Sequence, residues 1–345
     1  MSGNIIVLNR REEPVQDERK EVLNLAPSTL SVLERESRKI EDNSRDFLVD
    51  RGSLNINTDL DLYAPNMGCL PMSQFAMSQL CNKLGVPSRY INKCIETGRL
   101  DLAHDNLSSW LEDYPSSTFI REYNGRIRGV LTSKYSVCDT PEIIRVVDDV
   151  LDTNNYKIKG FFLNEERFHL RLVNKSPLPI VGEDLFSGIT IDSSDVGRSP
   201  LTVNFLVYKQ VCTNGLVVTR GKGTLFHQKH IGITADEFHE DLGESLNIVA
   251  SVEEEVVNRI MLTRERALHW DINSSHPEEV QELINYVRQQ TKLSEEHSKK
   301  VIHLMKNTYD DSRWGMINAI TEVAQEFSLE RRIELEKIAG SLLVA

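Results

Sequence analysis

The stretch KQVCTNGLVV places Cys212 two residues ahead of an Asn-Gly pair. A catalytic cysteine needs a base within reach and an electropositive setting that lowers the pKa of its thiol. His227 and His230 lie at the far end of the strand that returns from this tip, roughly 40 Å away at about 3.3 Å per residue. The pattern therefore predicts a hairpin with Asn214-Gly215 as its turn, and no catalytic residue.

The histidines and acidic runs do not indicate a metal or catalytic site either. His227 and His230 form an H-x-x-H pair with His239 further along, but no C-x-x-C pair accompanies them, and zinc sites commonly include thiolates at short spacing. The runs SVEEEVVNR and DEFHEDLGE can supply a carboxylate pair or bind magnesium, yet such runs usually form the solvated face of a helix. RGKGTL lacks the spacing of a phosphate-binding loop. We expect no metal, no cofactor and no enzymatic activity.

Basic residues recur along the strands expected in the middle of the chain. They are Arg121, Arg126, Arg128, Lys134, Arg167, Arg171, Lys209, Arg220 and Lys222. Arg126 and Arg128 are two residues apart, so both point to one face of a strand. Tyr123, Tyr135 and Tyr208 are interleaved with them, and such rings stack on bases while cations contact phosphates. These basic residues and Tyr208 form the predicted nucleic-acid-binding face. The alternative is scattered charge that protects sheet edges from aggregation.

A second candidate for DNA recognition lies in SQFAMSQLCNKLGVPSRYINKCIE. A helix that ends at Leu84, a turn at Gly85-Val86 and a helix that begins at Pro87-Ser88 have the spacing of a helix-turn-helix. Ordinary helical hairpins share this pattern. The residues that the second helix offers to DNA phosphates are Ser88, Arg89 and Lys93.

Charge and cysteine content restrict the candidate functions. The net charge of −12 over 345 residues argues against a protein coated in nucleic acid. From Ser116 to His230, however, 15 Lys and Arg accompany 12 Asp and Glu, giving +3, and the remaining 25 basic and 40 acidic residues give −15. The five cysteines form no C-x-x-C pair, which is typical of free thiols in a reducing cytosol. No apolar run approaches the roughly 18 residues of a membrane span.

The elements that must position these residues follow from periodicity and turn residues. We expect a flexible polar arm over residues 1–45 and a helical, helix-turn-helix-like module over 46–115. Hairpins such as STFIREY-NG-RIRGVLTSKYSV predict an antiparallel sheet domain over 116–233. Residues 234–345 have helical periodicity. The predicted fold is α+β, with a central antiparallel sheet, packed helices and helical regions at both ends.

Three segments carry a resemblance to a known family. NGRIRGVLTSKYSVCDTPEI, DVGRSPLTVNFLVYKQVCTNGLVV and RWGMINAITEVAQ resemble the phage- and plasmid-borne family called domain of unknown function 932, over about residues 60–327. The C-T-N-G tip and the W-G-x-x-N-A-x-T helix are its most specific parts. The resemblance implies a mobile-element protein in the cytoplasm of a bacterial host. It implies no catalytic residues, and it allows Trp314 and Asn318 to be contacts between helix and sheet.

Three hypotheses follow from these observations. The first is a non-enzymatic protein, homo-oligomeric, that binds single-stranded DNA through the basic sheet residues during recombination or replication. The layout of a hairpin-and-helix sheet resembles that of single-strand annealing proteins of phage recombination. The second is a helix-turn-helix regulator of duplex DNA. The third is a protein-interaction module, such as a host-defence antagonist, whose acidic surface engages a host or phage protein.

Overall fold

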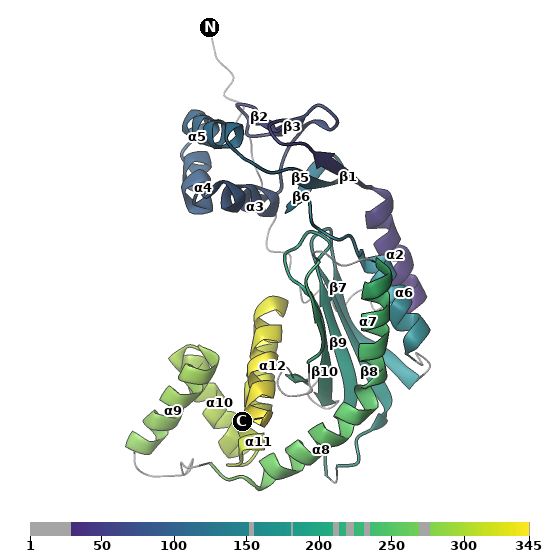
Figure 1. Cartoon of the computed structure of the whole chain (residues 1–345). Helices are drawn as coiled ribbons and strands as arrows, with labels where there is room; N and C mark the ends of the chain where they lie inside the picture. The colour runs from purple at the N-terminus through teal and green to yellow at the C-terminus, as the bar shows by residue number, and fades with distance from the viewer. Residues whose placement is uncertain are drawn as a thin grey trace.

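A computed structural model describes the chain apart from a few segments. These are residues 1–28, 152–154, 181, 210–213, 219–223, 231–234, 269–276 and 345. Helices pack on antiparallel sheets, which confirms the predicted α+β class. Figure 1 shows an N-terminal module at one end of the main sheet and the C-terminal helices toward the other end. None of the helices in the described part of the chain is long and apolar enough to span a bilayer.

The N-terminal module combines two small sheets with three helices. One sheet has the order β1-β5-β6 and the other β2-β3-β4. The strands are β1 (Ser44–Val49), β2 (Asn55–Ile56), β3 (Leu62–Ala64), β4 (Gly68–Leu70), β5 (Thr118–Tyr123) and β6 (Arg126–Thr132). The helices are α3 (Gln74–Leu84), α4 (Ser88–Glu96) and α5 (Leu100–Glu112). Leu80 and Leu107 of the helices share one apolar core with Ile120 and Val130 of the hairpin.

The module extends past the predicted boundary at residue 115. The first predicted hairpin, β5 and β6, belongs to it and not to the main sheet. β1 occupies the edge of β5, with Phe47 opposite Ile120, and the helices cover the hairpin's apolar face. Turn residues identify a hairpin, but they do not show which sheet it joins, because that depends on pairing with a strand distant in sequence.

The predicted flexible arm contains an ordered helix. Residues 1–28 lie outside the described chain, whereas α2 (Leu30–Asp42) packs beside α6 (Thr140–Val150). Leu30 and Leu33 are buried in the core of the body. These two leucines supply the apolar stripe of an otherwise charged helix, so the helix is stabilised by tertiary packing more than by its own periodicity.

The helix pair predicted from the GVPS segment is confirmed. α3 ends at Leu84, Gly85 adopts a left-handed φ of 69°, and α4 begins after Pro87. The amide of Val86 donates to the carbonyl of Cys81 at 2.9 Å, which closes the helix end as glycine at this position commonly allows.

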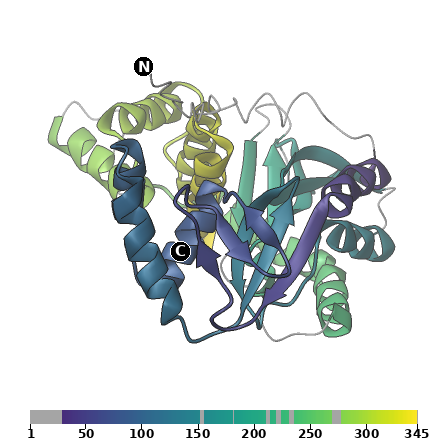
Figure 2. The ribbon, with the colours of Figure 1, turned by 90° about the horizontal axis from the view of Figure 1, so that it is seen from above.

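The body is a sheet with helices on both faces. Its order is β11-β10-β9-β8-β7, with β12 also paired to β10. The strands are β7 (Tyr156–Leu163), β8 (Phe168–Pro177), β9 (Leu185–Ser193), β10 (Leu201–Lys209), β11 (Asn214–Val218) and β12 (Thr224–Gln228). The remaining helices are α7 (Ala235–Asn247), α8 (Val249–Glu265), α9 (Pro277–Thr291), α10 (Glu295–Asn307), α11 (Arg313–Val323), the 3₁₀ turn η2 (Ala324–Glu326) and α12 (Leu329–Val344). In Figures 1 and 2, α6 and α7 lie on one side of the sheet and α12 on the other.

Strand β10 is buried on both faces, although apolar and polar residues alternate along much of it, a pattern typical of a half-buried strand. Val203 and Phe205 enter the main core. Asn204 and Tyr208, which lie on the other face, are 2% and 6% exposed. The helices that follow the sheet in sequence cover this second face, and a strand's own pattern does not reveal such a cover.

The Asn214-Gly215 pair lies in a strand and not in a turn. Both residues belong to β11, opposite Lys209 and Tyr208, and Cys212 lies outside the described residues. A Cβ on Gly215 would lie 3.0 Å from a guanidinium nitrogen of Arg171 and 3.4 Å from a carboxylate oxygen of Glu336. Glycine is therefore favoured here by the close passage of two side chains over the strand.

Those two side chains attach α12 to the sheet. Arg171 donates to both carboxylate oxygens of Glu336, at 3.1 and 2.5 Å, and its Nε donates to the ring of His169 at 3.1 Å. Arg332 also donates to Glu336, at 3.0 Å. The Glu336 side chain is fully buried, and its single carboxylate accepts hydrogen bonds from two guanidinium groups.

We predict that Glu336→Gln strongly destabilises the protein. The amide keeps the shape but leaves the buried Arg171 without a countercharge, which costs about 3–5 kcal/mol. Urea unfolding followed by circular dichroism measures the change. Glu334→Gln is the matched control, because Glu334 pairs with Arg331 on the exposed side of the same helix, and this substitution should cost at most about 1 kcal/mol. Equal effects of the two substitutions would contradict the assignment.

Candidate functional site

Several residues of the predicted nucleic-acid-binding face lie in the interior. Arg121 is 2% exposed and binds the carboxylates of Asp46, at 2.9 Å, and Asp139, at 2.5 Å. Arg128 is 1% exposed and donates to the carbonyl of Glu165 at 2.8 Å. The prediction that these side chains contact phosphates is wrong for this structure, because both are buried and donate to carboxylates or carbonyls of the chain.

Arg171 and Tyr208 require the same correction. Arg171 is buried under α12 by its contact with Glu336, and Tyr208 is buried with the ammonium of Lys159 lying 5.4 Å from its ring centroid. Neither side chain offers a stacking or phosphate-binding surface in this structure. Because both side chains are polar, the sequence suggested that they are exposed. In the structure Arg171 contacts Glu336 and Tyr208 contacts Lys159.

The other predicted basic residues are dispersed. Arg126 pairs with Glu165 at 3.0 Å, Arg167 with Glu330 at 3.3 Å, and Lys209 with Glu183 at 2.9 Å. Lys134 is exposed after β6, and Arg220 and Lys222 lie outside the described residues. Where the chain is described, these cations therefore do not form a shared basic face. Lys209 also contacts Asn318, and Trp314 donates to Glu183, so these two family residues join α11 to the sheet region.

The residues of the alternative, duplex-reading site keep their predicted places. Arg89 and Lys93 are exposed on α4, and Ser88 is half-buried at its start. Tyr90, also exposed, accepts a hydrogen bond from Asn106 of α5 at 3.2 Å. The helix pair thus presents two cations and an aromatic ring on the module's outer surface.

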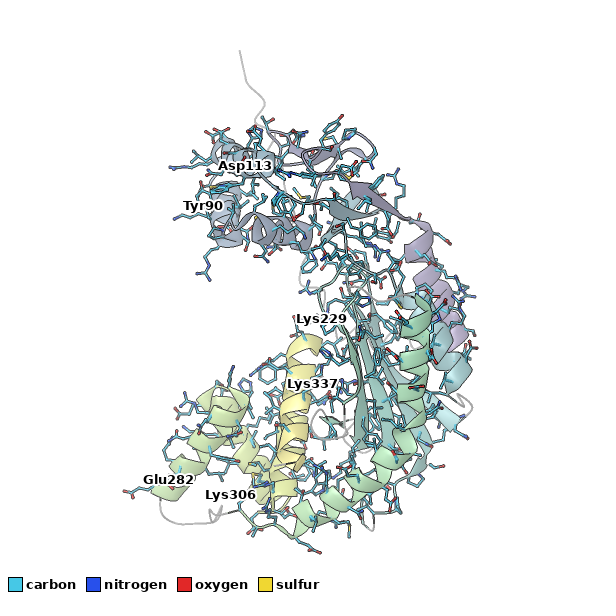
Figure 3. All side chains as sticks on the ribbon, in the orientation of Figure 1. Tyr90, Asp113, Lys229, Glu282, Lys306 and Lys337 are labelled. Atoms are coloured by element: carbon cyan, nitrogen blue, oxygen red, sulfur yellow. The ribbon has the colours of Figure 1, made fainter. Side chains whose placement is uncertain are left out.

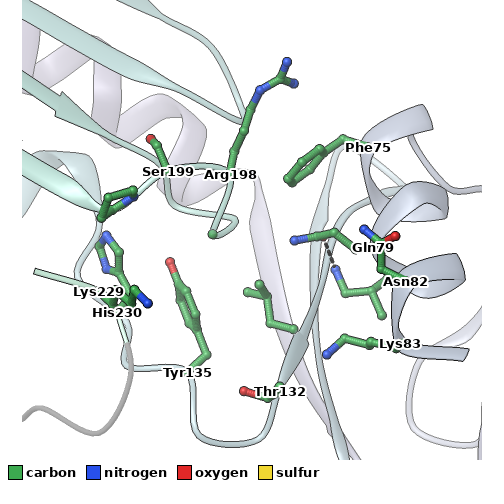
Figure 4. Close-up of a pocket in the computed structure, with 14 residues that line it drawn as sticks. Phe75, Gln79, Asn82, Lys83, Thr132, Tyr135, Arg198, Ser199, Lys229 and His230 are labelled. Carbon is green, nitrogen blue, oxygen red and sulfur yellow. Dashed lines mark hydrogen bonds between the residues drawn. The ribbon is translucent and has the colours of Figure 1, made fainter. Parts of the chain in front are cut away.

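A pocket of about 500 Å³ lies between the N-terminal module and the body. Figure 4 shows α3 on one side, with Phe75 and Lys83, and body residues on the other, with Tyr135, Arg198 and Lys229. The volume is within the range of small-molecule sites in proteins. The pocket combines cations, aromatic rings and neutral polar groups drawn from distant parts of the sequence.

Gln79 fixes the distance between the two walls. Its amide nitrogen donates to the carbonyl of Val196 in the β9–β10 connection at 2.8 Å, and its oxygen accepts from the amide of Val130 in β6 at 2.8 Å. Gly197 follows with φ of 71°, where any Cβ would approach the Leu131 side chain to 2.9 Å. This connection therefore needs glycine to turn beneath α3.

The floor of the pocket is aromatic. The hydroxyl of Tyr135 donates to the carbonyl of Asp195 at 2.9 Å, and its ring stacks on His230, with centroids 5.5 Å apart. Burial lowers the pKa of His230, so its ring is neutral near pH 7. Of the three tyrosines predicted to stack on bases, Tyr135 is the one that lines this pocket.

The pocket is electropositive. Lys83 is half-buried, and burial lowers its pKa without a compensating carboxylate within the described chain. Lys229 is exposed at the rim and likewise has no described ion-pair partner. Arg198 lies 5.2 Å from the ring centroid of Phe75 and pairs with Glu166 at 2.8 Å. Two unpaired ammonium groups thus accompany one neutralised guanidinium.

No local pattern in the sequence groups these residues. Lys83 belongs to the predicted helix pair, Arg198 to a segment that carries the family resemblance, and Lys229 to the H-x-x-H stretch. Their proximity depends on β5 and β6 joining the module, which places α3 over the β9–β10 connection. Tyr135 and His230 were singled out separately in the sequence, and no local pattern joins them.

A family model described as Domain of unknown function (DUF932) matches residues 128–341. The match begins within β6 and ends within α12. The match confirms the resemblance. It starts later than about residue 60, where the resemblance began, and it extends beyond residue 327 into the last helix. No curated protein and no solved structure matches the chain.

The carboxylate beneath the pocket floor predicts a pH dependence of stability. Asp195 accepts from the amide and hydroxyl of Thr140, at 3.2 and 3.0 Å. Burial, reinforced by repulsion from Asp139, raises its pKa to about 6, above the ordinary value of 3.8. Between these values the folded state holds more protons, so the free energy of unfolding falls as the pH rises from 4 to 7.

We expect Asp195→Asn to remove this part of the pH dependence, which amounts to at most about 3 kcal/mol. Asparagine keeps an oxygen for Thr140 and does not titrate. Urea midpoints of both proteins at pH 4.5 and 7 measure the difference, with the exposed Asp184→Asn as control. Parallel pH profiles for the parent and the Asp195 variant would show that this carboxyl is not the titrating group.

Proposed function

From the premise that the chain belongs to the DUF932 family, we propose that it is a non-enzymatic protein that binds single-stranded DNA. The site is the pocket between α3 and the body, in place of the sheet face expected from the sequence. The family resemblance implies a mobile-element protein in a bacterial cytoplasm, and we propose that this binding serves recombination or replication of that element.

The observation that carries the proposal is a pair of lysines that lie beside aromatic rings and have no ion-pair partner among the described residues. Lys83 and Lys229 offer ammonium donors to a phosphate, and Phe75 offers a ring surface to a base beside the stacked rings of Tyr135 and His230. Stacking on a ring contributes about 1–3 kcal/mol per base with little preference for sequence. The combination fits a nucleotide unit better than an inorganic anion, which needs no aromatic surface.

The size of the pocket favours a single strand. About 500 Å³ accommodates a group of nucleotide size, whereas a duplex keeps its bases stacked inside and offers only its backbone to so small a site. Figure 3 shows Lys229 on the side of the body that faces the module, with Tyr90 on the module across the open side. A strand can reach the pocket from this side.

The lining also supports a binding role. Its polar groups include cations, amides and hydroxyls, together with the imidazole of His230. Tyr135 uses its hydroxyl on a backbone carbonyl. Cations and amide donors of this kind hold an anion in place.

Fluorescence anisotropy of a labelled single-stranded oligonucleotide tests the proposal. We predict that Lys83→Ala/Lys229→Ala raises Kd at least about tenfold, because each charge-assisted hydrogen bond contributes about 1.5–3 kcal/mol. The slope of log Kobs against log salt should fall in magnitude by about 1.4, or about 0.7 for each phosphate that the variant no longer neutralises. Phe75→Ala should weaken binding without changing the slope.

The matched control is Lys157→Ala/Lys159→Ala, which removes two exposed lysines from β7, outside the pocket. It should leave Kd and slope unchanged. If both double variants weaken binding equally, binding is diffuse and the pocket is not the site. If the parent protein does not bind single strands even at low salt, the proposal fails, and a protein partner becomes the leading alternative.

The helix pair supports a second candidate, a regulator of duplex DNA, because α3 and α4 form with the predicted turn and expose Arg89 and Lys93. This function predicts preference for one duplex sequence, which Arg89→Ala/Lys93→Ala should abolish. The same anisotropy assay with duplexes selected from a random pool separates the two functions. If duplex recognition is the function, Lys83→Ala/Lys229→Ala should have little effect on the affinity for the duplex.

Self-association is a further part of the proposal. Leu102 and Trp110 are 40% and 54% exposed and lie eight residues apart on α5, and Met261 and Leu262 are 43% and 67% exposed on α8. Contiguous exposed apolar patches mark contact sites with other chains. We propose that a second copy of this chain covers these side chains in a homo-oligomer.

A further inference from the structure

A second set of chemically reactive side chains meets where α6 and α7 pack together. Cys138 precedes α6, Glu142 lies in its first turn, and His239 lies on α7. The sulfur, a carboxylate oxygen and a ring nitrogen of these residues are all within 4.8 Å of one another. This set is separate from the pocket and does not rest on the proposed function.

The fold holds all three side chains in place. Asp139 is the N-cap residue of α6, which puts Cys138 and Glu142 on one side of the helix start. α7 packs against α6, and Nε2 of His239 lies 3.1 Å from Oε1 of Glu142. In the sequence His239 follows His227 and His230 as a third histidine. The structure instead places His230 in the pocket floor and His239 beside a cysteine.

We propose that Cys138, Glu142 and His239 bind a Zn²⁺ ion. Thiolate, imidazole and carboxylate are the three ligand types that zinc uses in proteins, and the thiolate disfavours magnesium and calcium, which prefer oxygen. Ligand atoms within this mutual separation can converge on a tetrahedral ion through small rotations of the side chains. The guanidinium of Arg145 lies 3.9 Å from the Glu142 carboxylate, and a bound zinc ion would displace it.

Exposure differs among the ligands in a way that leaves an entry path. Cys138 is 3% exposed, whereas the side chains of Glu142 and His239 are 32% and 31% exposed. The ion therefore enters from the side of the carboxylate and the imidazole, and the fourth position faces solvent, where water completes the tetrahedron. Bound zinc joins α7 to α6, two helices on the same side of the sheet.

Metal titration of the full chain tests the site. The protein is freed of metal with a chelator and dialysed, and Zn²⁺ alone is added before gel filtration and elemental analysis. About one zinc per chain is expected. Co²⁺ added in its place should give the charge-transfer absorption of a thiolate–cobalt bond. Cys138→Ser should abolish that band, and His239→Gln should weaken zinc affinity at least about tenfold.

The controls use side chains of the same types elsewhere. Cys94→Ser removes a buried thiol from the core of the N-terminal module, and His227→Gln removes an exposed imidazole. Both should keep zinc affinity and the cobalt band. His239 is on the half-exposed face of a helix, so its variant keeps the test informative even if Cys138→Ser does not fold. Absence of stoichiometric zinc, or affinity unchanged in His239→Gln, overturns the proposal.

Discussion

The arrangement of the two parts of the molecule depends on the buried guanidinium of Arg121. Its donors reach Asp46 of β1, Asp139 ahead of α6 and the carbonyl of Asp195 in the β9–β10 connection. Asp46 belongs to the N-terminal module, and the other two partners belong to the body. Separating the two parts would remove Asp139 and the Asp195 carbonyl from this guanidinium and leave Asp46 as its one remaining partner among these three. Because α3 and the β9–β10 connection form opposite walls of the pocket, the same ion pairs fix the spacing of those walls.

This use of arginine explains why the basic content of the middle segment does not produce a basic surface. Arg121, Arg128 and Arg171 each occupy a buried position and donate to a carboxylate or carbonyl from a distant segment. Arginine suits such positions because its planar guanidinium can donate hydrogen bonds to two partners at once. The cations that remain available at the pocket are lysines, Lys83 and Lys229. The number of basic residues in a segment therefore says little about the charge of its surface. That charge depends on how many of the basic side chains lack a carboxylate partner.

Local pattern predicted most of the elements but few of their partners. The turn at Gly85 and the hairpin of β5 and β6 follow from residue types within a few positions, and the structure has them. The pairing of β1 with β5 and the burial of α2 depend on contacts with segments far along the chain, which no local pattern contains. Asn214-Gly215 illustrates the limit, because turn propensity and the passage of Arg171 over a strand both select glycine. The pocket was missed for the same reason, since its two walls meet only after the module has formed.

The unpaired state of Lys83 is what distinguishes the pocket from the other polar clusters. Gln79 and Lys83 are four residues apart, so they lie on the same side of α3, and the hydrogen bonds of Gln79 direct that side toward the body. Burial of the Lys83 ammonium lowers its pKa, which means that the charged form is disfavoured in the free protein. A chain with 52 acidic residues has carboxylates in excess, yet none of the described ones pairs with this ammonium. An anion bound in the pocket would restore the missing interaction, and the aromatic floor would determine which anions fit.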